Sequence, residues 1–410
     1  MTNFRFLHCA DLHLDSPLRG LEADPSAPAE DIRGATRQAF RNLVDFAINE
    51  NVDFVVAAGD LYDGDWQDWR TGHFLIGQVA RLSNAGIAFI AIRGNHDADS
   101  VITKQLRMPG TISRWLDHRK PETYLLPNLP VAIHGQSFAT RAVTENIALA
   151  YPPPDPERFN IGLLHSSAGE RDGHDTYASC SIEQLRAHGY DYWALGHIHA
   201  REELSRDPWI VFPGNLQGRH INETGPKGAT LVTVASGRVT NVSHIAFDTV
   251  RWARITVRLT NNSTEDDALT SIRAAITDAV ENAEGRLLAA RITLTGTSPL
   301  NLLFMRDLGA TQEKIRAEAL AVSGPERIWT EKIVVETSPA APREFTAGAS
   351  GRLIQALTEM DDGEINDDIL TYANVLLGKV NPLRQAIGGI DVPGVVTRAR
   401  ALLLGALVCE

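Results

Sequence analysis

Residues 52–63 read VDFVVAAGDLYD and join an apolar run to a turn that carries two carboxylates. The run is almost continuously apolar, which is typical of a strand that is buried on both faces of a sheet. Gly59 follows it directly and allows a sharp turn, so that Asp60 stands at the carboxyl end of the strand. Open α/β sheets bind their ligands in the loops beyond these strand ends. The stretch therefore predicts an α/β layered fold with a functional site at one edge of the sheet.

Four more strand-like runs end in polar residues in the same way. These runs are FRFLHCA (4–10), IAFIAIR (87–93), NIGLLH (160–165) and DYWALG (191–196). With the first run they deliver five clusters, which are Asp11-Leu12-His13, Gly59-Asp60-Leu61-Tyr62-Asp63, Gly94-Asn95-His96-Asp97, His165 and Gly196-His197-Ile198-His199. Carboxylates, a carboxamide and imidazoles at the ends of five strands are suitable ligands for two divalent cations.

The spacing within the clusters agrees with metal binding. Asp11 and His13 are one residue apart, so on an extended segment they face the same side, and His197 and His199 repeat that geometry. Two ions about 3.5–4 Å apart need a ligand that bridges them, and Asp60 is our candidate. His96 follows Asn95 without having to bind metal, so it is a candidate to protonate a leaving oxygen. Asp97 or another carboxylate would fix its tautomer.

Composition limits the function less than these clusters do. The 410 residues suggest two or three domains, and the net charge of −12 argues against a large basic surface for DNA. Three dispersed cysteines fit a reducing compartment, and no signal peptide or membrane span is evident, so we expect a cytoplasmic protein.

Periodicity divides the chain into parts. We expect a first domain over 1–250, an α+β domain over 251–337, a linker over 338–351 and a helical segment over 352–410. Helix-like segments at 36–49 and 67–84 separate the first strands. Segments 209–212, 229–235 and 239–247 predict a second sheet made largely of hairpins. Further on we expect strands at 251–259, 286–296 and 327–336 and helices at 267–283 and 311–321.

The ordered clusters resemble those of the calcineurin-like metallophosphoesterase superfamily. Within it, DLHLDSP (11–17), RGNHD (93–97), YDYWALGHIH (190–199) and PGNLQGR (213–219) most resemble the SbcD-type DNA repair exonucleases. The resemblance implies a layered β-sandwich flanked by helices, a smaller α+β capping domain and C-terminal helices. It also implies that one metal is held by Asp11, His13, Asp60 and His199, the other by Asp60, Asn95, His165 and His197, and that His96 is the catalytic histidine.

The resemblance further implies manganese as the working metal, DNA as the substrate and an SbcC-like coiled-coil ATPase as the partner. An amphipathic stretch within 395–406 is our candidate for contacting that ATPase. The sequence leaves open exonuclease against endonuclease activity and whether the chain forms a homodimer. A phosphodiesterase or phosphatase for nucleotides or other small phosphoesters is the alternative, and a non-enzymatic scaffold ranks low because every expected ligand type is present.

The roles of other polar residues near the clusters are not decided by the sequence. Arg93, Arg219 and His220 are candidates for binding the substrate, although the segment 213–228 also reads as an ordinary hairpin loop. Asp63 either orients a histidine or caps a helix. His8 and His134 lie inside apolar runs, which favours structural roles in the core.

Overall fold

The computed structural model describes residues 3–16, 27–63, 69–99, 107–169, 178–261 and 263–340. It divides into two compact units, of which the first runs to Ala253 and takes up Arg286–Ala289. Of the described residues, the second unit contains Arg254–Gly285 and those from Ala290 to Ala340. The expected helical segment 352–410 and nearly all of the expected linker lie outside the described residues.

The first sheet of the first unit is built around three parallel strands, β1 (Phe4–Cys9), β2 (Phe54–Ala58) and β3 (Ala88–Ile92). Its full order is β12-β11-β1-β2-β3-β4, which adds β4 (Arg114–Trp115) and the hairpin of β11 (Gly228–Ala235) and β12 (Arg238–Ala246). We expected that hairpin in a second sheet, and this prediction was wrong. β11 pairs antiparallel with β1 and has buried side chains on both faces, Leu231 on one and Val232 on the other.

The second sheet has the order β5-β6-β7-β8-β10-β9. Its central strands β6 (Val131–Gly135), β7 (Phe159–His165), β8 (Tyr192–Gly196) and β10 (Trp209–Phe212) run parallel. The outer strands β5 (Glu122–Leu125) and β9 (Glu202–Arg206) are antiparallel to their neighbours. The two sheets enclose an apolar core in which Phe6 stacks on Phe54 with ring centroids 5.0 Å apart.

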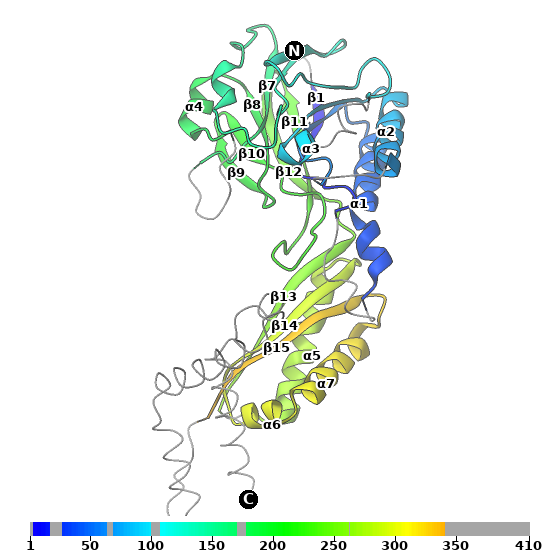
Figure 1. Ribbon diagram of the computed structural model, residues 1–410, viewed down its shortest axis with the longest axis vertical. Coiled ribbons are helices and arrows are strands. Elements are labelled where there is room, and N and C mark those ends of the chain that lie inside the picture. Colours follow the sequence, from blue (N-terminus) through cyan, green and yellow to red (C-terminus); the bar gives the residue numbers. More distant parts are fainter. Residues whose placement is uncertain are drawn as a thin grey trace, which may run out of the picture. The chain divides into compact units, whose positions relative to one another are not determined.

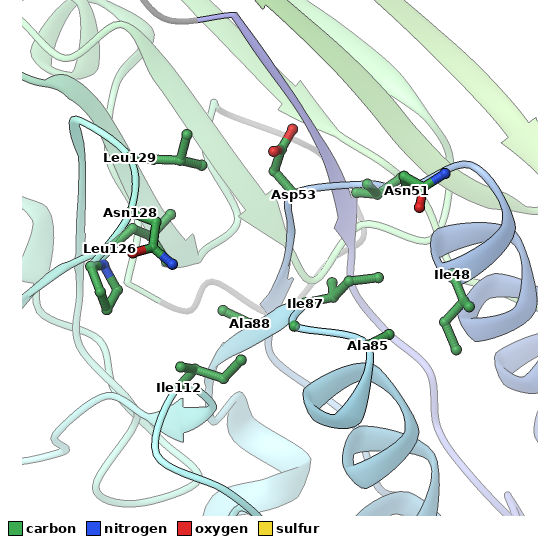
Figure 2. Close-up of a pocket in the computed structure, with 13 residues that line it drawn as sticks. Ile48, Asn51, Asp53, Ala85, Ile87, Ala88, Ile112, Leu126, Asn128 and Leu129 are labelled. Atoms are coloured by element: carbon green, nitrogen blue, oxygen red, sulfur yellow. The ribbon is translucent and has the colours of Figure 1, made fainter.

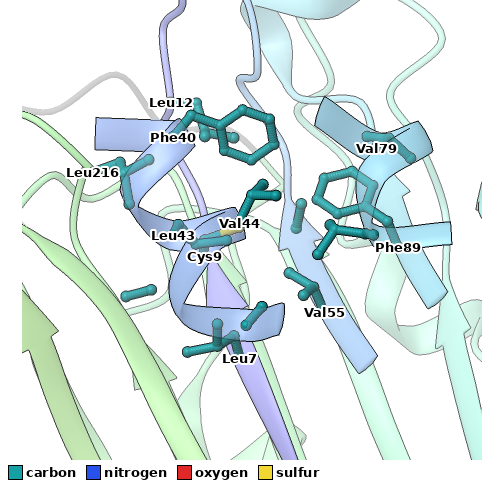
Figure 3. Packing of buried hydrophobic residues seen from close by; sticks show 14 of the residues in the cluster. Leu7, Cys9, Leu12, Phe40, Leu43, Val44, Val55, Val79, Phe89 and Leu216 are labelled. Atoms are coloured by element: carbon teal, nitrogen blue, oxygen red, sulfur yellow. The ribbon is translucent and has the colours of Figure 1, made fainter. Parts of the chain in front are cut away.

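Helices cover the outer faces of both sheets (Figure 1). α1 (Ala29–Asn49) and α2 (Trp69–Asn84) pack on the first sheet, where Phe40 and Val44 meet Leu7 and Val55 (Figure 3). The second sheet carries α4 (Ile182–Ala187) and the loop around Tyr151 and Tyr190. Alternate side chains along each strand point to the core between the two sheets and to the core under the helices. Both faces of the strands are therefore buried, which explains the continuous apolar runs. The first unit is therefore an α/β sandwich of four layers, in agreement with the expected fold class.

The second unit holds most of a three-stranded sheet with helices packed on it, and only the first residues of two of its strands fall in the first unit. The strands β13 (Val250–Leu259), β14 (Leu287–Ser298) and β15 (Ile328–Pro339) lie in that order, and the helices are α5 (Glu265–Asn282), α6 (Leu300–Arg306) and α7 (Leu308–Ser323). The sequence predicted all but the short α6. α5 begins at a capping box in which the Thr264 hydroxyl accepts from the amide of Asp267. None of the helices among the described residues is long and apolar enough to cross a membrane.

A cavity of about 440 Å³ opens at the amino ends of β2 and β3 (Figure 2). Aliphatic side chains such as Ile48, Ile87 and Ile112 line it together with the polar Asn51, Asp53 and Asn128. None of the predicted site residues lines it, because all of them lie at or beyond the carboxyl ends of their strands.

Candidate metal centre and active site

The predicted ligands come together at the carboxyl edge of the sandwich, where the two sheets meet. Asp11 and His13 follow β1, Asp60 follows β2, and Asn95 opens α3 (Asn95–Asp99) after β3. His165 is the last residue of β7, and His197 and His199 follow β8. The Nδ1 atom of His165 lies 2.8 Å from the carbonyl oxygen of Ala58, so a hydrogen bond joins the sheets beside the centre.

One group of ligand atoms belongs to Asp11, His13 and His199, and these atoms all lie within 4.8 Å of one another. The Nε2 atoms of His13 and His199 face each other at 3.1 Å, and the Nε2 atom of His199 lies 4.0 Å from Oδ1 of Asp11. Such imidazole and carboxylate atoms converging on one point suit a divalent cation.

A second group surrounds Asp60. Its Oδ2 atom lies 3.4 Å from Nε2 of His165 and 3.9 Å from Nε2 of His13, so one carboxylate oxygen faces both groups. The amide oxygen of Asn95 lies 3.0 Å from Nε2 of His165. The ring of His197 lies beside that of His165, with centroids 5.3 Å apart. This arrangement places Asp60 where a bridging ligand would have to lie.

Several of the predicted ligands have a strained backbone. Asp11, His13, Asp60 and His197 have φ angles of 52°, 42°, 54° and 103°, in the left-handed region that residues other than glycine rarely adopt. Such residues cost about 1–3 kcal/mol each and persist where the surrounding structure enforces them, commonly at functional sites. The strain turns the side chains out of the strand direction and toward one centre.

Two glycines allow the close approach of these segments. A Cβ atom on Gly94 would lie 2.2 Å from Oδ1 of Asp60, and one on Gly196 would lie 2.0 Å from the carbonyl oxygen of Ala58. Both distances are too short for any side chain. The glycines of the GNHD and GHIH clusters are therefore required by packing at the centre.

The electrostatics of the centre favour bound positive charge. Burial raises the pKa of Asp11, and it would raise that of Asp60, but the neighbouring His165 imidazole lowers the pKa of Asp60 below its usual value. Burial in turn disfavours a charged His165, yet Asp60 raises the pKa of this imidazole to about 9. The negative charge of Asp11 and Asp60 thus stabilises a protonated His165. Divalent cations bound at the same place would be stabilised by the same negative charge.

The outer nitrogens of two ligand histidines already have partners. The Nδ1 atom of His165 faces the Ala58 carbonyl oxygen, and that of His199 lies 2.7 Å from Oε1 of Glu223. The Arg219 guanidinium also lies 3.3 Å from Nδ1 of His199, but the carboxylate of Glu223 is the closer partner. Because the closer partner of each ring is an acceptor, Nδ1 carries the proton and the Nε2 lone pair faces the centre when the ring is neutral. The donors present therefore fit a pair of divalent cations, with Asp60 in the bridging position.

His96 stands next to the ligands and is held by a carboxylate. Its Nδ1 atom lies 3.0 Å from Oδ1 of Asp63. Burial lowers the pKa of His96, but the hydrogen bond to Asp63 and the charge of Asp60 raise it above the usual value. Asp97, our first candidate for this role, instead accepts hydrogen bonds from backbone amides, including those of Gly94 and Tyr62. Asp63 is therefore the residue that orients His96.

The three candidate substrate contacts lie in different surroundings. Arg219 has a side chain only 14% exposed and lies 3.2 Å from Glu223 and 3.7 Å from Asp63. His220 is 54% exposed on the same loop. The guanidinium of Arg93 lies over the ring of Trp115, 5.5 Å from its centroid. Of the three, His220 presents most of its surface to solvent.

The two histidines expected in the core are buried as predicted. His8 contacts the Tyr192 hydroxyl and the Leu195 carbonyl oxygen, and His134 contacts Thr123 and Asn160. Sequence reasoning missed Glu223, which contacts the candidate ligand His199 directly. The only signal was its place in a glycine-rich loop that follows the GHIH cluster.

This fold and this donor set define a metallophosphoesterase. Residues 4–201 match the family model of the calcineurin-like phosphoesterases, and residues 252–338 match that of the middle domain of the metallophosphoesterase YhaO. The chain is 33% identical to YhaO of Bacillus subtilis over 347 residues, which cover 83% of this chain and 84% of that protein. It therefore belongs to the calcineurin-like metallophosphoesterases, which use divalent metal ions.

The chain is also similar to archaeal proteins named DNA double-strand break repair protein Mre11. It is 28% identical to that of Sulfurisphaera tokodaii over 282 residues, covering 65% of this chain and 68% of the relative. It is 27% identical to that of Saccharolobus solfataricus over 217 residues, covering 50% and 52%. These similarities relate the chain to Mre11-type proteins.

Proposed function

We propose that the chain is a metal-dependent DNA nuclease that hydrolyses phosphodiester bonds, with manganese as its working metal. The observation that carries the proposal is the position of His96, which lies against the ligands and is oriented by Asp63. An imidazole that is held in this way beside a metal pair can donate a proton to a leaving oxygen. The similarity to proteins named for DNA double-strand break repair supports DNA as the substrate.

The residues divide the work of hydrolysis. Asp11, His13, Asp60 and His199 would hold one divalent ion, and Asp60, Asn95, His165 and His197 would hold a second. When bound, such ions would supply Lewis acidity toward the phosphate and lower the pKa of a water molecule. Asp63 fixes the proton of His96 on Nδ1 when the ring is neutral and stabilises the imidazolium when it is charged. His96 then holds a proton on Nε2 for the leaving alkoxide. Asn95 contributes an uncharged oxygen, which limits the negative charge around the phosphate.

The net charge of −12 sets a condition on DNA binding. Binding to the phosphate backbone of DNA has to rely on local positive charge, because the chain lacks the excess of positive charge of a basic module. Two divalent ions would add four positive charges at the site itself. Weak intrinsic affinity suits a subunit that works with an SbcC-like coiled-coil ATPase, and we propose such a partner.

The nuclease is tested with the full chain, manganese and linear duplex DNA. We expect cleavage by the wild type and a loss of about 10²–10⁴-fold in His96→Ser, with manganese binding preserved in the variant. His118→Ser is the matched control, because His118 is exposed and contacts Asp117 rather than the centre. Hydrolysis of bis-p-nitrophenyl phosphate with both single- and double-stranded DNA left intact would contradict the nuclease and favour a small-molecule phosphodiesterase.

The partner is tested separately. We expect that a chain lacking residues 380–410 no longer binds the coiled-coil ATPase in a pull-down, since this part holds the amphipathic stretch that the sequence offers for docking. Unchanged binding of the partner to the shortened chain would contradict this docking site.

A further inference from the structure

Glu223 lies behind the metal ligand His199, in the loop that connects β10 with β11. Its side chain is 6% exposed, and its Oε1 atom lies 2.7 Å from Nδ1 of His199. This contact leaves Nε2 of His199 facing His13 and Asp11 at the centre. The carboxylate therefore selects the tautomer that a metal ligand needs at Nε2.

The carboxylate of Glu223 is itself held by three donors. Its Oε2 atom accepts from the backbone amide of Arg219 at 2.7 Å and from the side-chain amide of Asn215 at 2.9 Å. Its Oε1 atom also accepts from the Arg219 guanidinium at 3.2 Å. Asn215 is fully buried, so this support comes from the interior and not from a mobile surface group. A carboxylate with this many fixed donors has a defined orientation toward His199.

The same loop holds His199 at its backbone. Lys227 donates from Nζ to the carbonyl oxygen of His199 at 2.8 Å. Arg219 also reaches Asp63, the carboxylate that orients His96, at 3.7 Å. The loop thus contacts the ring of His199 through Glu223 and Arg219, and its carbonyl oxygen through Lys227 and the amide of Asn215. The Arg219 guanidinium also connects the loop to the carboxylate beside His96. Such a pattern is typical of outer-shell support for a metal site.

We propose that Glu223 is a positioning residue that fixes the tautomer and ring orientation of His199, and that Arg219 holds Glu223 in place instead of serving mainly as a substrate contact. The inference rests on the divalent-metal chemistry of the proposed function. It assigns to Glu223 control over the affinity of the metal position that contains Asp11, His13 and His199. The position that contains Asn95 and His165 should not depend on Glu223.

The test is a manganese titration of the metal-free full chain by calorimetry, with no DNA present. We expect two binding events in the wild type and about 10–100-fold weaker binding at one position in Glu223→Ala, with the other unchanged. Glu223→Gln keeps an acceptor for Nδ1–H but loses the charge, so its loss should be about half of that in logarithmic terms. Glu203→Ala is the control, because Glu203 forms ion pairs with Arg201 and Arg206 and is not in contact with a ligand.

A loss of manganese affinity at one position only distinguishes a positioning role of Glu223 from a general destabilisation of the fold, which would weaken both positions. Equal weakening at both positions, or wild-type affinity in a folded Glu223→Ala, would overturn the inference. If the alanine variant does not fold, as judged by circular dichroism, the glutamine variant decides by the same criterion. Because no DNA is used, failure of the nuclease proposal leaves this result intact. Cleavage of DNA together with unchanged manganese affinity in Glu223→Ala would instead sink only the role of Glu223.

Discussion

The interior of the first unit and its carboxyl edge are built from the same strands but differ in almost every physical respect. Along β2, Phe54, Val56 and Ala58 are fully buried, the first two paired with both β1 and β3 and Ala58 with β3. Asp60, two residues after Ala58, is also buried, but its side chain is charged and its backbone is in the left-handed region with a φ of 54°. The interior stabilises the fold by burying apolar area at about 25 cal/mol per Å². The edge uses part of that stability to keep strained, charged ligands in place.

This contrast predicts that the centre tolerates little variation in geometry. The strain at the edge is set by neighbouring backbone, such as the contact of Gly196 with Ala58, and the neighbouring strands are in turn fixed by the apolar layers. Substitutions at the edge should therefore affect chemistry more than folding, and substitutions inside should do the reverse. The following predictions are ordered by the size of the expected effect.

The largest effect should come from Asp60→Asn. Asparagine tolerates the left-handed backbone but is a poor bridge between two cations, so hydrolysis should fall about 10⁴-fold, which corresponds to several kcal/mol of lost electrostatic stabilisation. The measurement is hydrolysis of bis-p-nitrophenyl phosphate with manganese. Asp53→Asn, just before the start of the same strand, is the matched control and should retain activity. If Asp60→Asn lowers the rate of hydrolysis tenfold or less, the claim that the edge serves chemistry and the interior serves folding is contradicted.

Phe54→Ala should show the opposite behaviour. Its ring is fully buried and stacked on Phe6, so its removal should lower the free energy of unfolding by about 3–5 kcal/mol. Urea unfolding measures that loss. Activity per folded molecule should stay within a few-fold of wild type. A variant of normal stability but much reduced activity would show that the core and the centre are not separable in this way.

The pH dependence of stability should reveal a third, smaller effect inside the core. Burial lowers the pKa of His8 to about 3, so the folded state keeps the ring neutral, while the unfolded state protonates it below the ordinary histidine pKa of 6.5. The unfolded state then binds the extra proton, and stability falls as pH drops from 6.5 toward 3. Between pH 7 and pH 5 His8 should account for a loss of roughly 2 kcal/mol. His8→Gln should show a correspondingly flatter decline in urea unfolding, and an equal decline in both proteins would refute this assignment.

The smallest effect concerns the second unit, which holds none of the ligands. Thr264→Ala removes the cap of α5 and should destabilise that helix by about 1 kcal/mol. Hydrogen exchange of the α5 amides should quicken, while hydrolysis of the small phosphodiester should not change. Ser271→Ala, in the middle of the same exposed helix face, is a suitable control. A change in hydrolysis would mean that the second unit influences the centre.

Local sequence predicted the strands and the polar side chains that gather at their ends, because both depend on near neighbours. Continuous apolar runs specified β1, β2, β3, β7 and β8, and the residue types after them identified the groups that the structure brings together. Long-range pairing was not predictable, as in β11, whose partner β1 lies more than 200 residues earlier. The choice of Asp63 over Asp97 as the partner of His96, and the contact of Glu223 with His199, also depend on how loops fold back.

The central claim is that the carboxyl edge holds two divalent ions bridged by Asp60. The most direct measurement is anomalous diffraction from crystals of the full chain grown with manganese. We expect two peaks about 3.5–4 Å apart, with Asp60 in contact with both and His96 in contact with neither. A single ion, or two ions that do not share Asp60, would contradict the account.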